Sequence, residues 1–208
     1  MSSHNYDVDW RPAKGRDYLF SFVGSNTSCV RDILLREWGL GVSSSSSGPP
    51  KDVHVEENAL AGATYSEMMQ RSKYCLVPDG HVPWNFRFLD ALHHGCVPVV
   101  VSESWHPPLH RLLRWTEQGE FPVLFVHPSR VGELRELLSS QEEQQRWQRM
   151  QELTLPLASL LDPSRQGFYE SQLAELVLAR EEWRMRAASP AVGAAPRHCR
   201  EFMRRLTP

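Results

Sequence analysis

Apolar and polar positions follow two alternating patterns along this chain. Short, nearly continuous apolar runs are typical of buried strands, and the segments between them place apolar residues at helical spacing. Strands are expected at residues 17–25, 51–57, 73–78, 97–102 and 121–126. Helices are expected at residues 28–40, 64–72, 85–94, 109–115, 129–150 and 164–186.

The alternation of strands and helices predicts the fold class. Successive strands separated by helical segments are typical of parallel sheets, in which each helix crosses back over the sheet. We therefore predict an α/β fold, a Rossmann-like open and mostly parallel sheet with helices on both faces. The all-apolar run at residues 97–101 suits a strand that is covered on both faces. In such folds, ligands bind beyond the carboxyl ends of the strands.

The same pattern divides the chain into three parts. Residues 1–15 form an N-terminal extension, and residues 16–187 form one lobe. The serine-rich stretch at residues 41–50 within this lobe is expected to be a flexible loop. Residues 188–208 are expected to be a mobile C-terminal tail.

Composition and charge exclude several classes of protein. The chain has 208 residues, of which 41% are hydrophobic, and this is a globular composition. A net charge of -2 does not favour a nucleic acid or an anionic membrane as the partner. No transmembrane segment is expected, because no stretch approaches the roughly 18–20 apolar residues that span a bilayer. The N-terminus also lacks a signal-peptide pattern, so a complete chain of this sequence would be cytoplasmic.

The candidate chemistry lies in the loop and helix that follow the strand at residues 73–78. Asn85 can cap this helix, and Arg87 and Asp90 lie one turn apart near its N-terminus. A helix N-terminus favours phosphate, and the forked arginine side chain suits a diphosphate. The carboxylate of Asp90 can accept hydrogen bonds from a ribose diol. A surface ion pair of small energy would explain the same spacing, and the spacing alone favours this interpretation over a binding site.

The end of this helix carries two further predictions. Gly95 is expected to end the helix in a left-handed conformation. Cys75 and Cys96 lie at or just before predicted strands, so they could be neighbours, but the sequence leaves open whether they are bonded. The four cysteines show no zinc spacing, and two prolines interrupt the histidine pair at 106 and 110. We therefore expect no metal site.

The segment from residue 72 to residue 115 resembles the C-terminal half-domain of the exostosin family of glycosyltransferases. The family motif combines an aromatic residue before Cys-Leu, a proline and a glycine-containing loop. It continues with a polar residue two before an arginine, an acidic residue before Ala-Leu, and a final Gly-Cys-Val-Pro-Val. These positions are filled here by Tyr74, Cys75, Leu76, Pro78, Gly80, Asn85, Arg87, Asp90, Ala91, Leu92, Gly95, Cys96, Val97, Pro98 and Val99. The resemblance covers about residues 16–155.

This resemblance implies a fold, an activity and a set of binding residues. It implies the donor-binding C-terminal lobe of a two-lobed GT-B glycosyltransferase, which transfers a sugar from a nucleotide-sugar donor to a glycan or glycoprotein acceptor. Arg87 would face the diphosphate and Asp90 the ribose. The implied phosphate-lining residues are Asn85, Gly80 and Asp79, and Trp84 lies in the same loop, where it would either line the site or cap the core. The resemblance also implies a Golgi location and neither a metal nor any other cofactor, and it assigns no catalytic residue.

The chain departs from this family pattern in three ways. Asn85 stands where serine is common, and Asp90 stands where the longer glutamate is common. Only about fifteen residues precede the first strand, so neither an acceptor lobe nor a membrane anchor is expected in this chain. A donor lobe alone can bind a nucleotide sugar but cannot orient an acceptor, so the isolated chain is expected to transfer little sugar. The alternative hypothesis is a non-catalytic nucleotide-binding or interaction module derived from the same fold.

Overall fold

The computed structural model describes residues 15–39, 50–57, 62–80, 85–105, 107–113, 121–165 and 167–186. Three sequence predictions lie almost wholly outside these residues: the N-terminal extension, the loop at 41–50 and the C-terminal tail. Trp84 also lies outside them. The boundaries of the three predicted parts therefore stay predictions.

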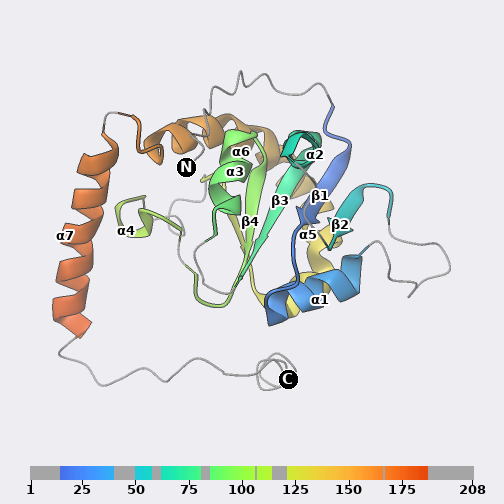
Figure 1. The fold of residues 1–208 in the computed structure, drawn as a ribbon, viewed down its shortest axis with the longest axis horizontal. Helices are drawn as coiled ribbons and strands as arrows, with labels where there is room; N and C mark the ends of the chain where they lie inside the picture. The colour runs from blue at the N-terminus through green and yellow to red at the C-terminus, as the bar shows by residue number, and fades with distance from the viewer. Residues whose placement is uncertain are drawn as a thin grey trace.

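The centre of the described structure is a five-stranded sheet (Figure 1). Its strands lie in the order β2-β1-β3-β4-β5, and every neighbouring pair is parallel. The strands are β1 (Tyr18–Val23), β2 (Val53–Glu56), β3 (Ser72–Pro78), β4 (Val97–Val101) and β5 (Leu124–Val126). Together with the helices between them, this sheet confirms the predicted Rossmann-like α/β fold.

Helical segments connect and follow the strands. They are α1 (Cys29–Trp38), α2 (Gly62–Arg71), α3 (Arg87–His93), α4 (His110–Leu113), η1 (Pro128–Glu133), α5 (Leu134–Ser139), α6 (Gln141–Leu160) and α7 (Phe168–Arg186). Figure 1 shows α7 at one edge of the molecule, beside α4. Helix α6 extends well beyond the predicted end at residue 150 and contains Pro156. The sequence pattern did not assign this extension.

Each face of the sheet has its own apolar core, because successive side chains of a strand point to opposite faces. Tyr74 and Leu76 of β3 lie in the core formed with α1, η1, α5 and the first part of α6. Cys75 and Val77 point the other way, toward α2, α3 and the last part of α6. Strand β3 is therefore buried on both faces and paired on both edges, which fixes its position firmly.

The turn between α3 and β4 has the geometry that the sequence predicts. Gly95 has a φ of 62°, in the left-handed region, and this confirms the predicted conformation. The Gly95 N–H donates to the carbonyl of Leu92 (3.1 Å), and the Cys96 N–H donates to the carbonyl of Ala91 (2.9 Å). These two bonds form a Schellman motif, which satisfies carbonyls at the end of the helix. The turn thus places Cys96 next to Cys75 of β3.

A disulfide joins Cys75 of β3 to Cys96 of this turn. The pairing resolves the alternative that the sequence left open. Both cysteines are buried, with Met69 of α2 and Ala91 of α3 around them. The bond therefore ties the centre of the sheet to the C-terminal end of α3, at a point where α2 also packs.

Replacing Gly95 by alanine should destabilise the protein by about 1 kcal/mol, because a Cβ resists the left-handed backbone conformation. Gly132→Ala is the matched control. Its φ is not positive, and the closest atom to an added Cβ is a Glu37 carboxylate oxygen at 3.8 Å. Urea unfolding curves of the two variants provide the measurement. Equal midpoints for both variants would show that Gly95 has no special conformational role.

Replacing both Cys75 and Cys96 by alanine should lower the free energy of unfolding by about 3 kcal/mol. The two residues are 21 apart in the sequence, and opening a loop of this size enlarges the unfolded ensemble by about that free energy. The measurement is chemical unfolding of the variant and of the oxidised parent. A variant that matches the oxidised parent would contradict a stabilising role for the bond.

Candidate functional site

The strand order predicts a ligand crevice at the carboxyl ends of β1 and β3. The connections from β1 and β3 leave toward opposite sides of the sheet, so the loops after these two strands diverge. A crevice opens at such a topological switch point, and ligands of open α/β sheets bind there. Gly24 follows β1, and Asp79 follows β3, so both lie at this point.

Arg87, in the first turn of α3, extends from the β3 side of the crevice to the end of β1. Its Nη1 donates to the backbone carbonyl of Val23 and, over 3.3 Å, to the hydroxyl of Tyr65. Its guanidinium carbon lies 4.8 Å from the centre of the Phe22 ring. The side chain is half-buried and held by three neighbours, so Arg87 also contributes to the fold. It is not the freely exposed group of a surface ion pair.

One nitrogen of Arg87 has no hydrogen-bond partner. The Nε atom is buried, and no polar atom of the described residues accepts its proton. Unpaired buried donors are rare in folded proteins and usually need a functional or structural reason. The buried Nε is therefore an unsatisfied donor, which costs stability.

Gly24 allows the guanidinium to lie against the backbone of the β1–α1 loop. A Cβ at this position would stand 2.5 Å from Nη2 of Arg87 and 3.3 Å from its Cζ. Any other residue would therefore displace the arginine from its present position. The observed position of Arg87 therefore requires a glycine at the end of β1.

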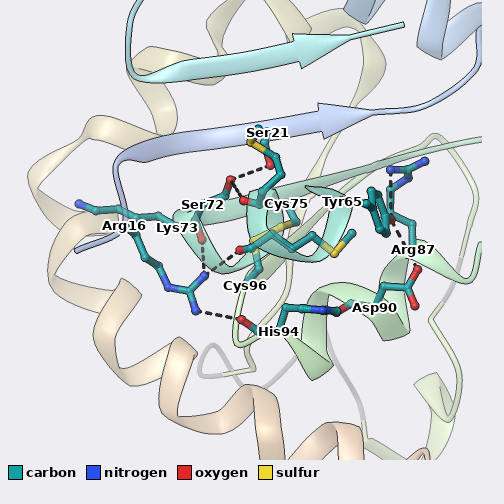
Figure 2. The surroundings of a disulfide bond; sticks show 12 residues. Arg16, Ser21, Tyr65, Ser72, Lys73, Cys75, Arg87, Asp90, His94 and Cys96 are labelled. Carbon is teal, nitrogen blue, oxygen red and sulfur yellow. Dashed lines mark hydrogen bonds between the residues drawn. A yellow bond between two sulfur atoms is a disulfide. The ribbon is translucent and has the colours of Figure 1, made fainter. Parts of the chain in front are cut away.

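Asp90 lies one turn further along α3, on the same side of the helix. Arg87 and Asp90, both among the described residues, do not form a direct ion pair. The hydroxyl of Tyr65 lies between them instead and donates to Oδ2 of Asp90 over 3.5 Å (Figure 2). Burial raises the pKa of Asp90, and His94 and Arg87 partly oppose this effect. The ionised carboxylate is therefore kept here at a cost in stability.

A second arginine, Arg31 of α1, reaches the same place from the other side of the crevice. It is only 9% exposed, and its guanidinium carbon lies 5.8 Å from the Phe22 ring. Burial lowers the pKa of Arg31, and the positive charge of Arg87 lowers it further. The two guanidinium groups are therefore close enough to repel one another, which concentrates positive charge at the end of β1.

Arg31 also ties together the two loops that form the crevice. Its Nη1 donates to the carbonyl of Ser25 (3.0 Å) and the hydroxyl of Thr27 (2.9 Å), and its Nε donates to the carbonyl of Asp79 (3.1 Å). Ser28, the N-cap of α1, donates to the same Asp79 carbonyl over 2.6 Å. The crevice therefore has a pre-organised backbone in this structure.

The carboxylate of Asp79 is directed toward β4 and not toward the arginines. Its Oδ2 accepts a 2.8 Å hydrogen bond from Ser102, which follows β4. Burial raises the pKa of Asp79, and the Ser102 hydrogen bond opposes the rise. These contacts give Asp79 a role in joining the loops that follow β3 and β4.

The N-cap of α3 is Phe86 and not the predicted Asn85, but the side chain of Asn85 still bonds to the start of the helix. Its Oδ1 accepts from the N–H of Arg87 (3.0 Å), and its Nδ2 donates to the carbonyl of Pro78 (3.1 Å). The side chain thus closes the loop after β3 and orients the residue that carries the guanidinium. Gly80 lies in the described part of the same loop and is half-buried.

The structure brings most of the predicted site residues to one edge of the sheet. Arg87, Asp90, Asn85, Asp79 and Gly80 all follow β3 and lie between its end and the first turns of α3. Sequence reasoning missed the groups contributed by other elements, namely Tyr65 of α2, Arg31 of α1 and Gly24 after β1. The side chains of Tyr65 and Arg31 come from helices that follow the neighbouring strands β2 and β1, so the predicted fold could have drawn attention to them. Their convergence depends on the strand order, which the sequence pattern does not supply.

The fold and this candidate site define an open parallel α/β domain with two arginines at its switch point. Comparison with known proteins assigns the domain to a family. The profile of the Exostosin GT47 domain matches residues 5–141, about two thirds of the chain. The chain therefore belongs to the exostosin GT47 family, and the resemblance found in the sequence is confirmed.

Individual relatives agree with this assignment. A probable glycosyltransferase of Arabidopsis thaliana is 33% identical over 137 residues, which cover 66% of this chain and 26% of the relative. Exostosin-1 of Mus musculus is 33% identical over 132 residues, covering 59% of this chain and 18% of the relative. An Exostosin-1 homolog of Caenorhabditis elegans is 40% identical over 83 residues, or 35% of this chain and 22% of the relative. The chain thus spans about a quarter or less of the length of these relatives.

Two further properties of the described residues bear on function. Among them, no helix combines the length and apolarity that a membrane crossing requires. Within the same part of the chain, histidine, cysteine, aspartate and glutamate side chains nowhere gather in a group of three or more that could hold a metal ion. The candidate site of the described domain consists of guanidinium, phenol, amide and carboxylate groups.

Replacing Asp90 by asparagine should leave the protein at least as stable as the parent at pH 7. Burial raises the folded-state pKa of Asp90 above its ordinary value of 3.8, so the folded state binds more protons than the unfolded state between these two values. The parent therefore loses stability as the pH rises through this window, and Asp90→Asn does not.

Urea unfolding between pH 3 and pH 8 measures this difference. The difference in unfolding free energy that favours Asp90→Asn over the parent should shrink as the pH falls toward the ordinary pKa of a carboxyl group. A variant that is less stable than the parent by the same amount at every pH would instead make Asp90 a structural residue.

Proposed function

We propose that this domain is the donor-binding lobe of an exostosin-type glycosyltransferase, which holds a nucleotide sugar for transfer to a glycan or glycoprotein acceptor. The observation that carries the proposal is the convergence of Arg87 and Arg31 on the end of β1, at the switch point of a parallel sheet. Two guanidinium groups beside a helix N-terminus form a site for a doubly charged diphosphate. Membership of the GT47 family connects this site with sugar transfer.

The roles of the side chains follow from their chemistry. The diphosphate would lie over Gly24, between the N-terminus of α1 and the guanidinium of Arg87. Negative charge there would relieve the repulsion between the two arginines, and this gain in Coulomb energy favours binding. Asp90 would accept hydrogen bonds from the ribose diol.

Asn85, Asp79 and Gly80 would act through the shape of the loop after β3. Asn85 holds the N-terminus of α3, and Asp79 anchors the loop to its neighbours, so the loop keeps its conformation beside the crevice. Trp84 belongs to the same proposal as a lining residue. Charge neutralisation by arginine requires no metal ion or other cofactor, and we propose that the lobe uses none.

The matched segments cover 26% or less of the relatives described above, so transfer itself is proposed for a whole protein that also presents an acceptor to this lobe. A Golgi location, and a glycan or glycoprotein as acceptor, belong to the same proposal. The alternative is a nucleotide-binding or interaction module without catalysis. Robust sugar transfer would exclude this alternative, whereas nucleotide binding without transfer by a protein with both lobes would support it.

Arg87→Ala should weaken the binding of uridine diphosphate about ten- to a hundredfold, the usual effect of losing a charge-assisted hydrogen bond to phosphate. Asp90→Asn should weaken uridine diphosphate more than its 2′-deoxy analogue, which lacks one hydroxyl of the diol. Arg130→Ala is the matched control, because Arg130 is exposed and pairs with Glu133 on η1. Isothermal titration calorimetry of all four proteins measures the affinities.

Unfolding curves recorded on the same samples separate binding from stability. Arg87→Ala should also lose some stability, because its guanidinium bonds to Val23 and Tyr65 and lies near Phe22. Binding must therefore be measured where each variant is fully folded. Unchanged affinity in a folded Arg87→Ala protein would leave Arg87 with a structural role only and would overturn the proposed site.

A further inference from the structure

The hydroxyl of Tyr65 contacts both side chains that we assign to nucleotide binding, yet Tyr65 comes from a different helix. It accepts from Nη1 of Arg87 over 3.3 Å and lies 3.5 Å from Oδ2 of Asp90 (Figure 2). A phenol has one donor and two acceptor positions, so it can serve both neighbours at once. Burial raises the pKa of Tyr65 to about 12, and the phenol therefore stays protonated at every working pH.

The ring of Tyr65 holds this hydroxyl in place. The guanidinium carbon of Arg87 lies 5.5 Å from the ring centre, and Phe22 approaches the same guanidinium. The Tyr65 ring also packs against the buried cluster that contains the Cys75–Cys96 disulfide. The tyrosine thus lies between the disulfide and the two charged side chains, as Figure 2 shows.

The helices that carry these residues are fixed at their opposite ends by Arg16. Its Nη1 donates to the carbonyl of Met69 in α2 (3.0 Å) and to the carbonyl of Ser72, and its Nη2 donates to the carbonyl of His94 after α3 (2.9 Å). One half-buried cation therefore joins the C-terminal ends of α2 and α3. With both helices held in this way, the contact between Tyr65, Arg87 and Asp90 cannot easily be replaced by a shift of either helix.

We propose that the Tyr65 hydroxyl is a positioning group that couples Arg87 to Asp90, so that the diphosphate and the ribose diol are bound by one pre-organised unit. Without this hydroxyl, Arg87 would keep its contacts with Val23 and Phe22 but lose the link to the carboxylate. The side-chain rotamer of Asp90 would then no longer be coupled to the position of Arg87. This inference rests on the proposed function, because it assigns the two partners of Tyr65 to the nucleotide.

The coupling predicts a pH effect that a purely structural tyrosine would not produce. The charged and titratable groups around Asp90 are Tyr65 on α2 and Arg87, His93 and His94 on or beside α3. The hydrogen bond from Tyr65 lowers the pKa of Asp90, so its removal should raise that pKa further. Because the ribose diol needs the ionised carboxylate, binding should then be lost at a higher pH than in the parent.

The test compares Tyr65→Phe with the parent and with Tyr169→Phe, which removes the hydroxyl of an exposed tyrosine on α7. Phenylalanine keeps the ring beside the guanidinium and the disulfide, so the fold should be preserved. Uridine diphosphate is titrated into each protein by calorimetry from pH 4.5 to pH 8. Tyr65→Phe should bind about three- to tenfold more weakly at pH 7, the usual effect of one lost hydrogen bond. Its affinity should also fall at a higher pH than that of the parent.

Each outcome decides one question. A folded Tyr65→Phe protein with the affinity and pH profile of the parent would overturn the positioning role while leaving the proposed function intact. Weaker binding with an unshifted pH profile would also overturn it, because Tyr65 would then support the fold without acting on Asp90. A parent that binds no uridine diphosphate would overturn the proposed function and, with it, the role of Tyr65.

Discussion

Strand β3 pairs with β1 along one edge and with β4 along the other, and the rest of the structure depends on this double pairing. Tyr74 aligns with Phe20 on one side and with Val97 on the other. Because β3 is central, its carboxyl end brings the loops after β1, β3 and β4 together. The disulfide from Cys75 to Cys96 strengthens the same arrangement by joining β3 to the turn that follows α3. Strand pairing and disulfide together decide where the first turns of α1, α2 and α3 lie.

Polar and charged groups at this end of the sheet are arranged in a way that does not maximise stability. Burial disfavours the charged forms of Asp79 and Asp90, and Arg31 and Arg87 repel one another. One nitrogen of Arg87 also finds no partner among the residues that the structure describes. An optimally stable domain would avoid such contacts, and natural proteins retain them mainly where function requires them. These contacts all lower the stability of the fold and all lie at the switch point, which is a physical argument for a binding site there. It is independent of the family assignment.

The hydrogen bonds around the crevice also explain how the surrounding loops are held in place. Arg31 and Ser28 fix the carbonyl of Asp79, Ser102 fixes its carboxylate, and Asn85 fixes the first turn of α3. The polar atoms of these residues form hydrogen bonds with neighbouring segments of the chain. Arg87 and Asp90 depend in turn on Tyr65, which lies beneath them on α2. The crevice is therefore formed by two sets of residues, one that shapes the loops and one that can contact a ligand.

The sequence by itself determined the strands, most of the helical segments, the fold class and much of one side of the candidate site. Periodicity located all five strands, Gly95 marked the left-handed turn, and the spacing of Asn85, Arg87 and Asp90 placed these residues at a helix start. These features are local, because they depend on residues that are close together along the chain. The partners of Arg87 and the bonding of Cys75 could not be read in the same way. Tyr65, Gly24 and Arg31 come from other elements, and only the order in which the strands pair brings them within hydrogen-bonding or packing distance of α3 and its loop.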